Sequence, residues 1–491
     1  MTVPEIVRQY KANAQDVPEI DLYQRNGKPT LPISPEEPPE EPSKELEALV
    51  KPKVLIAGGG LGGLTLAILL KKANIPFLVF ERAKEVKPLG SAISLGSNVM
   101  PLLKQMGVYD EFEQAAKPLS HVHVITDEMK TVYTMAFDWL EKVTTYKTFI
   151  IPRPDLYDIL WRHVPRKNIH LGKRILSFKQ NDHGVTIRCS DNSTYHGDIL
   201  VGADGAYSTI RQTLFKELKA AEKLPASDDV TVPFNCICLV GQTEPLDPEE
   251  FPHLKEEYCK DYSILGKDMC TSGKKNDSFR NSEWGPEAAE FMSREVRDYR
   301  IPGGKEGKTR TLGDLFDRTP KNLMSKVMLE EKVFSTWYSG RVVLLGDACH
   351  KLVPSAGQGG VTAMHDSVTL ANWIATLQAP SLSELDTAFK EYRDERFPII
   401  QDEFTAEVMC NVVRDFKIPG SNSGKVHTLG HLIDKTPKDR VAKIILEKFF
   451  STWHGRVVLL GDEVDSRGVV EEYVTSRSRQ MSSRMVVNIG G

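Results

Sequence analysis

A glycine-rich turn between two apolar runs constrains this chain more than any other stretch. Residues 53–83 read KVLIAGGGLGGLTLAILLKKANIPFLVFERA, so an apolar run, a turn, an amphipathic stretch and a second apolar run follow one another. This order predicts a strand, a helix and another strand, which together form the βαβ unit of a parallel sheet. Gly58, Gly60 and Gly63 form GxGxxG at the predicted start of the helix.

Each glycine of this motif has a separate physical task. Gly58 permits the tight turn, Gly60 lets a pyrophosphate approach the backbone, and Gly63 allows close packing of helix on strand. The helix N-terminus adds N–H groups and a positive dipole. Glu81 ends the second apolar run near the spacing of about 20 residues at which an acid binds ribose hydroxyls. The pattern predicts a site for the ADP half of NAD or FAD, and the alternative is a glycine turn without a ligand.

Composition excludes several other classes. Lys plus Arg (63) nearly balances Asp plus Glu (67), so the net charge of -4 gives no electrostatic reason to bind nucleic acid. No apolar run approaches the roughly 18–20 residues that cross a bilayer, and the first residues lack a secretory signal, so we expect a soluble, cytoplasmic protein. The 7 cysteines are scattered without a Cys/His cluster, so we expect reduced thiols and no metal site.

Two later motifs place further polar groups after predicted strands. GRVVLLGD (340–347) is typical of a buried strand that delivers Asp347 to its carboxyl end, where a carboxylate can accept hydrogen bonds from the hydroxyl groups of a ligand. The turn from Gly357 to Gly360 then precedes a helix whose first N–H groups would stabilise negative charge on a bound ligand. The other motif is DILVGADGAYSTIR (198–211).

With GxGxxG, these motifs resemble the three fingerprints of single-component (class A) FAD-dependent monooxygenases of the salicylate and para-hydroxybenzoate hydroxylase type. The resemblance covers roughly residues 53–400 and is strongest to the fungal branch that includes terpenoid epoxidases. It implies FAD as cofactor, NAD(P)H as a visiting co-substrate, O2, and an apolar or aromatic small molecule as substrate. In that family a flavin C4a-hydroperoxide hydroxylates or epoxidises the substrate.

The resemblance also nominates residues that spacing alone does not. Asp204, with Ser208 and Arg211 completing its motif, matches the family aspartate near the FAD pyrophosphate, which also helps the nicotinamide donor to bind. Arg153 matches an arginine at a helix that contacts the cofactor, and Ser94 matches a position that lines the flavin through its backbone. His350 matches a position with a mainly structural role, and no catalytic acid or base is identified.

The implied architecture is α/β: a Rossmann-like FAD-binding domain with an inserted mixed β-sheet substrate domain and a helical C-terminal region. The expected divisions are a peripheral or disordered extension (1–50), the first part of the FAD-binding domain (51–225, with excursions to the substrate domain around 120–150), a shortened substrate domain (226–330), the return to the FAD-binding domain with a helix (331–410), and a partial duplication of 296–347 (411–491).

The duplication raises the question of a second site. STWYSGRVVLLGDACH (335–350) recurs as STWHGRVVLLGDEV (451–464), but no glycine turn or apolar helix follows Asp462. Since a sheet position accepts one strand, we expect residues 335–347 to occupy it and the second copy to be peripheral or poorly ordered.

Two departures from the family bear on activity. An asparagine that usually follows GQG is absent, and we expect Thr362 to replace part of its hydrogen bonding. Only CTSG joins SILGKDM to KKNDSF, where the family has further strands of the substrate chamber. One alternative is a flavin-dependent prenyl-chain reductase, because that group shares the three fingerprints. The short substrate segment and the repeated tail favour another alternative, an FAD-binding protein with lost activity. The sequence does not identify the oligomeric state.

Overall fold

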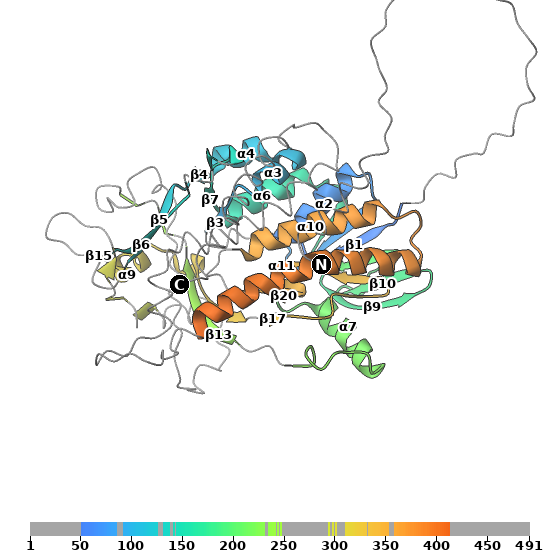
Figure 1. Ribbon diagram of the computed structural model, residues 1–491. Coiled ribbons are helices and arrows are strands. Elements are labelled where there is room, and N and C mark those ends of the chain that lie inside the picture. The colour runs from blue at the N-terminus through green and yellow to red at the C-terminus, as the bar shows by residue number, and fades with distance from the viewer. Residues whose placement is uncertain are drawn as a thin grey trace, which may run out of the picture. The chain divides into compact units, whose positions relative to one another are not determined.

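A six-stranded sheet in the order β18-β19-β12-β1-β2-β8 forms the centre of the fold (Figure 1). All neighbours in it pair in parallel except β18, which runs antiparallel to β19. The strands are β1 (Val54–Ala57), β2 (Phe77–Glu81), β8 (Ile169–Leu171), β12 (Ile199–Gly202), β18 (Tyr338–Ser339) and β19 (Val342–Leu344). Every residue of β1, β12 and β19 is buried, as expected for parallel strands covered on both faces.

The structure, a computed structural model, describes residues 51–412 except 86–91, 126–130, 138–140, 143, 231–233, 242, 245, 248–292, 295–296, 299, 302–309, 331 and 353–357. The expected extension (1–50), the second copy of the repeat, Gly357, and the segments SILGKDM and KKNDSF lie outside the described residues. Among the described residues, no helix is long and apolar enough to cross a membrane.

Helices cover both faces of the sheet. In Figure 1, α2 (Leu61–Lys72) and α10 (Gly359–Ala375) lie side by side on one face, and α7 (Thr209–Ala220) lies on the other with β9 and β10. α10 also packs against the long helix α11 (Leu382–Val412). The other α-helices within the described residues are α3 (Met100–Met106), α4 (Tyr109–Ala115), α6 (Arg153–His163) and α9 (Leu312–Phe316).

Smaller antiparallel sheets surround this core. They are β3-β7-β4 (Ala92–Leu95, Phe149–Pro152, Lys117–Pro118), β11-β10-β9 (Thr194–Gly197, Gly184–Cys189, Ile175–Asn181), β5-β6 (His121–Ile125, Thr131–Ala136), β13-β16 (Phe234–Gly241, Met324–Glu330), β14-β15 (Arg300–Ile301, Arg310–Thr311) and β17-β20 (Lys332–Val333, His350–Lys351). The pair β13-β16 comes from the segment expected to form the substrate domain.

The strand–helix–strand unit expected at 53–83 is confirmed, with Glu81 as the last residue of β2. The first copy of the repeat occupies the sheet, because Val342, Val343 and Leu344 pair with β12. A residue outside the sheet anchors the start of this first copy. The buried Asp228 accepts hydrogen bonds from the backbone N–H groups of Ser335 and Thr336, both at 2.8 Å.

Candidate cofactor site

The register of the central sheet brings the three sequence motifs to one edge. The residues aligned across four neighbouring strands are Phe80, Ala57, Gly202 and Leu344. The motif residues that follow them along the chain are Glu81, Gly58, Asp204 and Asp347. Because carboxyl ends of parallel strands share an edge, these groups face the crevice in which α/β folds bind ligands.

The three motif glycines have separate environments. Gly58 has φ of 101°, and a Cβ there would lie 2.4 Å from the carbonyl oxygen of Ala203. A Cβ on Gly63 would lie 2.1 Å from the carbonyl oxygen of Gly58. By contrast, a Cβ on Gly60 would meet no atom of the described residues within 4 Å. The turn therefore leaves open space in front of Gly60, at the N-terminus of α2, which fits a pyrophosphate.

Glu81 closes one side of this space. Its Oε2 accepts a hydrogen bond from the backbone N–H of Gly59 at 2.9 Å, and its Oε1 accepts one from the N–H of Ala83 at 2.9 Å. Each carboxylate oxygen can accept a second hydrogen bond, so the group can still bind ribose hydroxyls.

Helix α6, which begins at Arg153, packs against the same turn. A Cβ on Gly59 would lie 3.3 Å from Trp161 and 3.4 Å from the Tyr157 hydroxyl. Residues four apart lie on one helix face, so exposed Arg153 at the start of α6 continues the row of Tyr157 and Trp161. Burial, with a smaller contribution from Glu81, raises the pKa of the Tyr157 hydroxyl above its ordinary value. Sequence analysis missed both aromatic residues, although their i, i+4, i+8 spacing from Arg153 was visible.

Asp204 lies against the glycine turn and also caps a helix. Its Cα lies 2.9 Å from the position that a Cβ on Gly58 would take. Its Oδ2 accepts hydrogen bonds from the N–H of Thr209 at 2.7 Å and of Ile210 at 3.3 Å, and its Oδ1 accepts one from Ser208 Oγ at 2.5 Å. Burial raises the pKa of Asp204, while these hydrogen bonds act in the opposite direction. Part of its hydrogen-bonding capacity is therefore used to start α7.

Arg211 joins the second motif to the third. Its buried guanidinium donates to the carbonyl oxygen of Ala206 at 2.6 Å and to that of Ala348 at 2.9 Å. It also stacks 4.4 Å from the ring centroid of Phe334. The arginine thus fixes the loop of Asp204 relative to the turn that carries Asp347.

Asp347 lies in the short turn directly after β19. Its Oδ2 pairs with Lys351 Nζ at 2.8 Å, and the side chain is 33% exposed. The preceding Gly346 has φ of 61°, in the region that favours glycine. The carboxylate therefore remains accessible at the edge where the glycine turn lies.

The remaining expected residues gather around β3. Ala92 pairs with Pro152, directly before Arg153, so Ser94 on the same strand lies near the start of α6. A Cβ on Gly360 would lie 2.6 Å from Ile93, so the first turn of α10 packs against this strand.

The role expected of Thr362 does not match its environment. Its side chain is fully buried, and its hydroxyl donates to the carbonyl oxygen of Gln358 at 2.8 Å, because a threonine in a helix can bond to the preceding turn.

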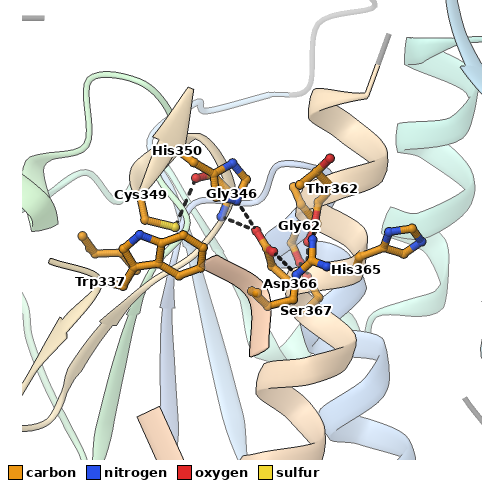
Figure 2. Close-up of polar contacts among 12 residues, drawn as sticks. Gly62, Trp337, Gly346, Cys349, His350, Thr362, His365, Asp366 and Ser367 are labelled. Atoms are coloured by element: carbon orange, nitrogen blue, oxygen red, sulfur yellow. Dashed lines mark hydrogen bonds and ion pairs between the residues drawn. The ribbon is translucent and has the colours of Figure 1, made fainter. Parts of the chain in front are cut away.

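Behind Asp347 lies a buried ionic network that sequence analysis did not anticipate. Figure 2 shows Asp366 of α10 directed toward His350 and the backbone of Gly346. Its other partner is Arg396 of α11. The one visible signal was an acid within the apolar helix GGVTAMHDSVTLANW. This network also explains the burial of His350, which is 1% exposed.

Comparison with known families agrees with this geometry. The family model described as "FAD binding domain" matches residues 51–405. The chain is 29% identical over 365 residues to the FAD-dependent monooxygenase paxM of Penicillium paxilli, covering 70% of this chain and 75% of that protein. It is likewise 29% identical over 374 residues to the FAD-dependent monooxygenase esdpE of Penicillium shearii, covering 71% of this chain and 75% of that protein.

Solved structures share the fold. Klebsiella pneumoniae HpxO complexed with FAD and uric acid aligns with a TM-score of 0.55 at 19% identity, covering 83% of this chain and 96% of that one. The tetracycline destructase Tet(51) aligns with a TM-score of 0.54 at 17% identity, covering 82% of this chain and 97% of that one. At these identities the likeness concerns the fold alone.

Proposed function

The chain belongs to the FAD-binding domain family, and from this premise we propose that it is an FAD-dependent monooxygenase that uses NAD(P)H and O2 to hydroxylate or epoxidise an apolar or aromatic small molecule. The single observation that supports this most is the common edge of the sheet at which Gly58, Glu81, Asp204 and Asp347 follow four aligned strand positions. One extended ligand can contact all four only because the strands are in this register.

The ADP half of FAD is assigned to the first motif. The open face of Gly60 and the N-terminus of α2 hold the pyrophosphate, and Glu81 accepts the ribose hydroxyls. Arg153, at the start of α6, offers a positive charge on the same side, and Asp204 contacts the pyrophosphate region and assists the nicotinamide donor.

The flavin half is assigned to the third motif. Asp347 accepts hydrogen bonds from the ribityl chain, while Ser94 lines the ring through its backbone. The N–H group of Gly360 stabilises negative charge near the ring, because the N-terminus of α10 is positively polarised and no acid in its first turn opposes this effect. Gly357, for which the same role is proposed, lies outside the described residues. When bound, FAD supplies the acceptance of hydride from NAD(P)H and the activation of O2. Protein residues supply binding, orientation and exclusion of water.

Two other functions were compatible with the sequence. A prenyl-chain reductase would share the FAD motifs, but the relatives named above are monooxygenases, which does not favour that alternative. An FAD-binding protein with lost activity would share the same site, so only a turnover measurement separates it from an enzyme.

The test combines absorbance spectroscopy with oxygen consumption. The purified full chain should carry FAD, which NADH or NADPH bleaches and O2 restores. In the presence of a substrate, consumption of NAD(P)H should require O2 and yield a product with one added oxygen atom. Protein without flavin would contradict the proposal, and a reduced double bond formed without O2 would identify the reductase instead.

A further inference from the structure

An aspartate, an arginine and a histidine are buried together behind the turn that carries Asp347. Asp366 and Arg396 are 0% exposed, and His350 is 1% exposed. Asp366 Oδ1 accepts a hydrogen bond from Arg396 Nε at 2.7 Å, and its Oδ2 lies 2.5 Å from His350 Nε2. Oδ2 also accepts a hydrogen bond from the backbone N–H of Gly346 at 3.2 Å (Figure 2).

These side chains form a hydrogen-bonded ionic network and not a metal centre. Cys349, His350 and Asp366 offer atoms close enough for a metal. However, His350 and Asp366 bond directly, and a metal between them would need about 2 Å to each ligand atom. Burial also raises the pKa of the Cys349 thiol well above its usual value, which keeps it protonated.

Buried charges often stabilise a fold no better than apolar side chains of similar volume, so stability alone does not explain this network. Its position around Asp347 indicates another role. Gly346 and His350 lie on either side of Asp347 in the chain, and both are bonded to Asp366. The carboxylate therefore fixes the backbone before and after Asp347.

Helix α11 holds the same turn from a second point. Tyr392, one helical turn before Arg396, donates from its hydroxyl to the carbonyl oxygen of Leu344 at 3.2 Å. Arg396 also reaches the carbonyl oxygen of Thr362, in the first turn of α10, at 3.5 Å. The exit of β19 and the start of α10 are thus tied to one rigid surface.

We propose that Asp366 and Arg396 are positioning residues for the flavin, which set the place of Asp347 and of the N-terminus of α10 without acting on the reaction themselves. This inference rests on the proposed function. It predicts that a substitution that weakens a hydrogen bond of this network reduces FAD affinity more than a comparable substitution at another buried position next to the central sheet.

Arg341 provides a matched control, because it lies just before the start of β19 whereas the Asp366 network lies beyond the end of β19. It is 2% exposed and donates to the carbonyl oxygens of Asn181 at 2.8 Å and Pro380 at 2.9 Å. Arg341 comes directly before β19, whereas Gly346 and His350, which Asp366 contacts, come after β19. Both arginines are therefore buried, but only one lies next to the proposed flavin site.

The experiment compares Arg396→Lys with Arg341→Lys in the full chain. Unfolding of the apoprotein measures stability, and titration with FAD measures the dissociation constant. We expect both variants to be destabilised, but the FAD dissociation constant to rise about tenfold or more in Arg396→Lys and less than about twofold in Arg341→Lys. Equal changes in the two variants would overturn the inference.

A second pair keeps the test informative if Arg396→Lys does not fold. His350→Gln retains an N–H donor for Asp366, whereas His350→Leu does not. The glutamine variant should keep the FAD affinity and visible flavin spectrum close to those of the unaltered protein, and the leucine variant should lose affinity and shift the spectrum. Indistinguishable binding in this pair would also overturn the inference. Failure of the unaltered protein to bind FAD would refute the proposed function instead.

Discussion

The carboxylate of Glu81 accepts a hydrogen bond from the backbone N–H of Gly59 at 2.9 Å, which joins the end of β2 directly to the turn after β1. Glu81, proposed to bind the ribose, and the glycine turn, proposed to bind the pyrophosphate, are thereby held in a fixed arrangement before any ligand binds. Preorganisation of this kind reduces the entropy that binding must overcome.

Replacing Glu81 should test this link. Glu81 accepts the two hydrogen bonds with different oxygens. In Glu81→Gln one of these oxygens becomes an NH2 group, which cannot accept, so one of the two hydrogen bonds is lost. We expect the stability of the apoprotein to fall by about 1 kcal/mol and the FAD dissociation constant to rise about tenfold. Titration with FAD measures the change, with Glu85→Gln on the exposed surface as control. An unchanged dissociation constant would remove Glu81 from the site.

Two glycines of one motif should respond differently to alanine. The Cβ of Gly63→Ala would lie 2.1 Å from the carbonyl oxygen of Gly58, so we expect a loss of about 1–3 kcal/mol in stability. The Cβ of Gly60→Ala meets only open space among the described residues, so stability should fall by less than about 1 kcal/mol while FAD binding weakens about tenfold or more. Thermal unfolding of the apoprotein and FAD titration separate the two. Normal FAD affinity in Gly60→Ala would place the pyrophosphate elsewhere.

The repeated GD sequence offers its own control. Asp347→Ala should deplete FAD from the purified protein, whereas Asp462→Ala in the second copy should not, because the glycine turn follows Asp347 alone. The Asp347 side chain is partly exposed and pairs with Lys351, so removing it should change stability by less than about 1 kcal/mol. The ratio of flavin to protein absorbance measures the outcome. Equal depletion in both variants would refute the assignment of the first copy.

Asp366 should make the fold sensitive to acid. Burial alone would raise its pKa, but the electrostatic effects and hydrogen bonds of His350 and Arg396 lower it to about 2. A carboxyl with a lowered folded pKa contributes stability above its ordinary pKa and loses it as the pH falls. We therefore expect about 2 kcal/mol to be lost between about pH 4 and pH 2.

Denaturant unfolding at successive pH values measures this loss. His350→Gln removes one of the causes of the lowered pKa of Asp366, so it should move the loss of stability to higher pH. The matched control is His183→Gln, on the exposed surface. The same acid profile in both variants would show that the electrostatic effect of His350 does not stabilise the carboxylate.

The sequence by itself determined the local parts of this protein. GxGxxG between two apolar runs identified the βαβ unit, and the position of Glu81 at the end of β2 was predicted correctly. The strand before Asp347 and the helix that begins near Gly360 were also predicted from their patterns. These predictions hold because strand and helix periodicity and glycine turns depend on neighbouring residues.

Only the tertiary structure decided which of these parts meet. The alignment of Ala57 with Gly202 and Leu344 joins strands that are far apart in the chain, and periodicity identifies a strand without naming its partner. The packing of α6 against the glycine turn and the bond between Asp366 and Arg396 likewise required the folded chain. A buried ion pair is favourable only where packing excludes water from both partners and supplies the remaining hydrogen bonds, and no local pattern of residues specifies that environment.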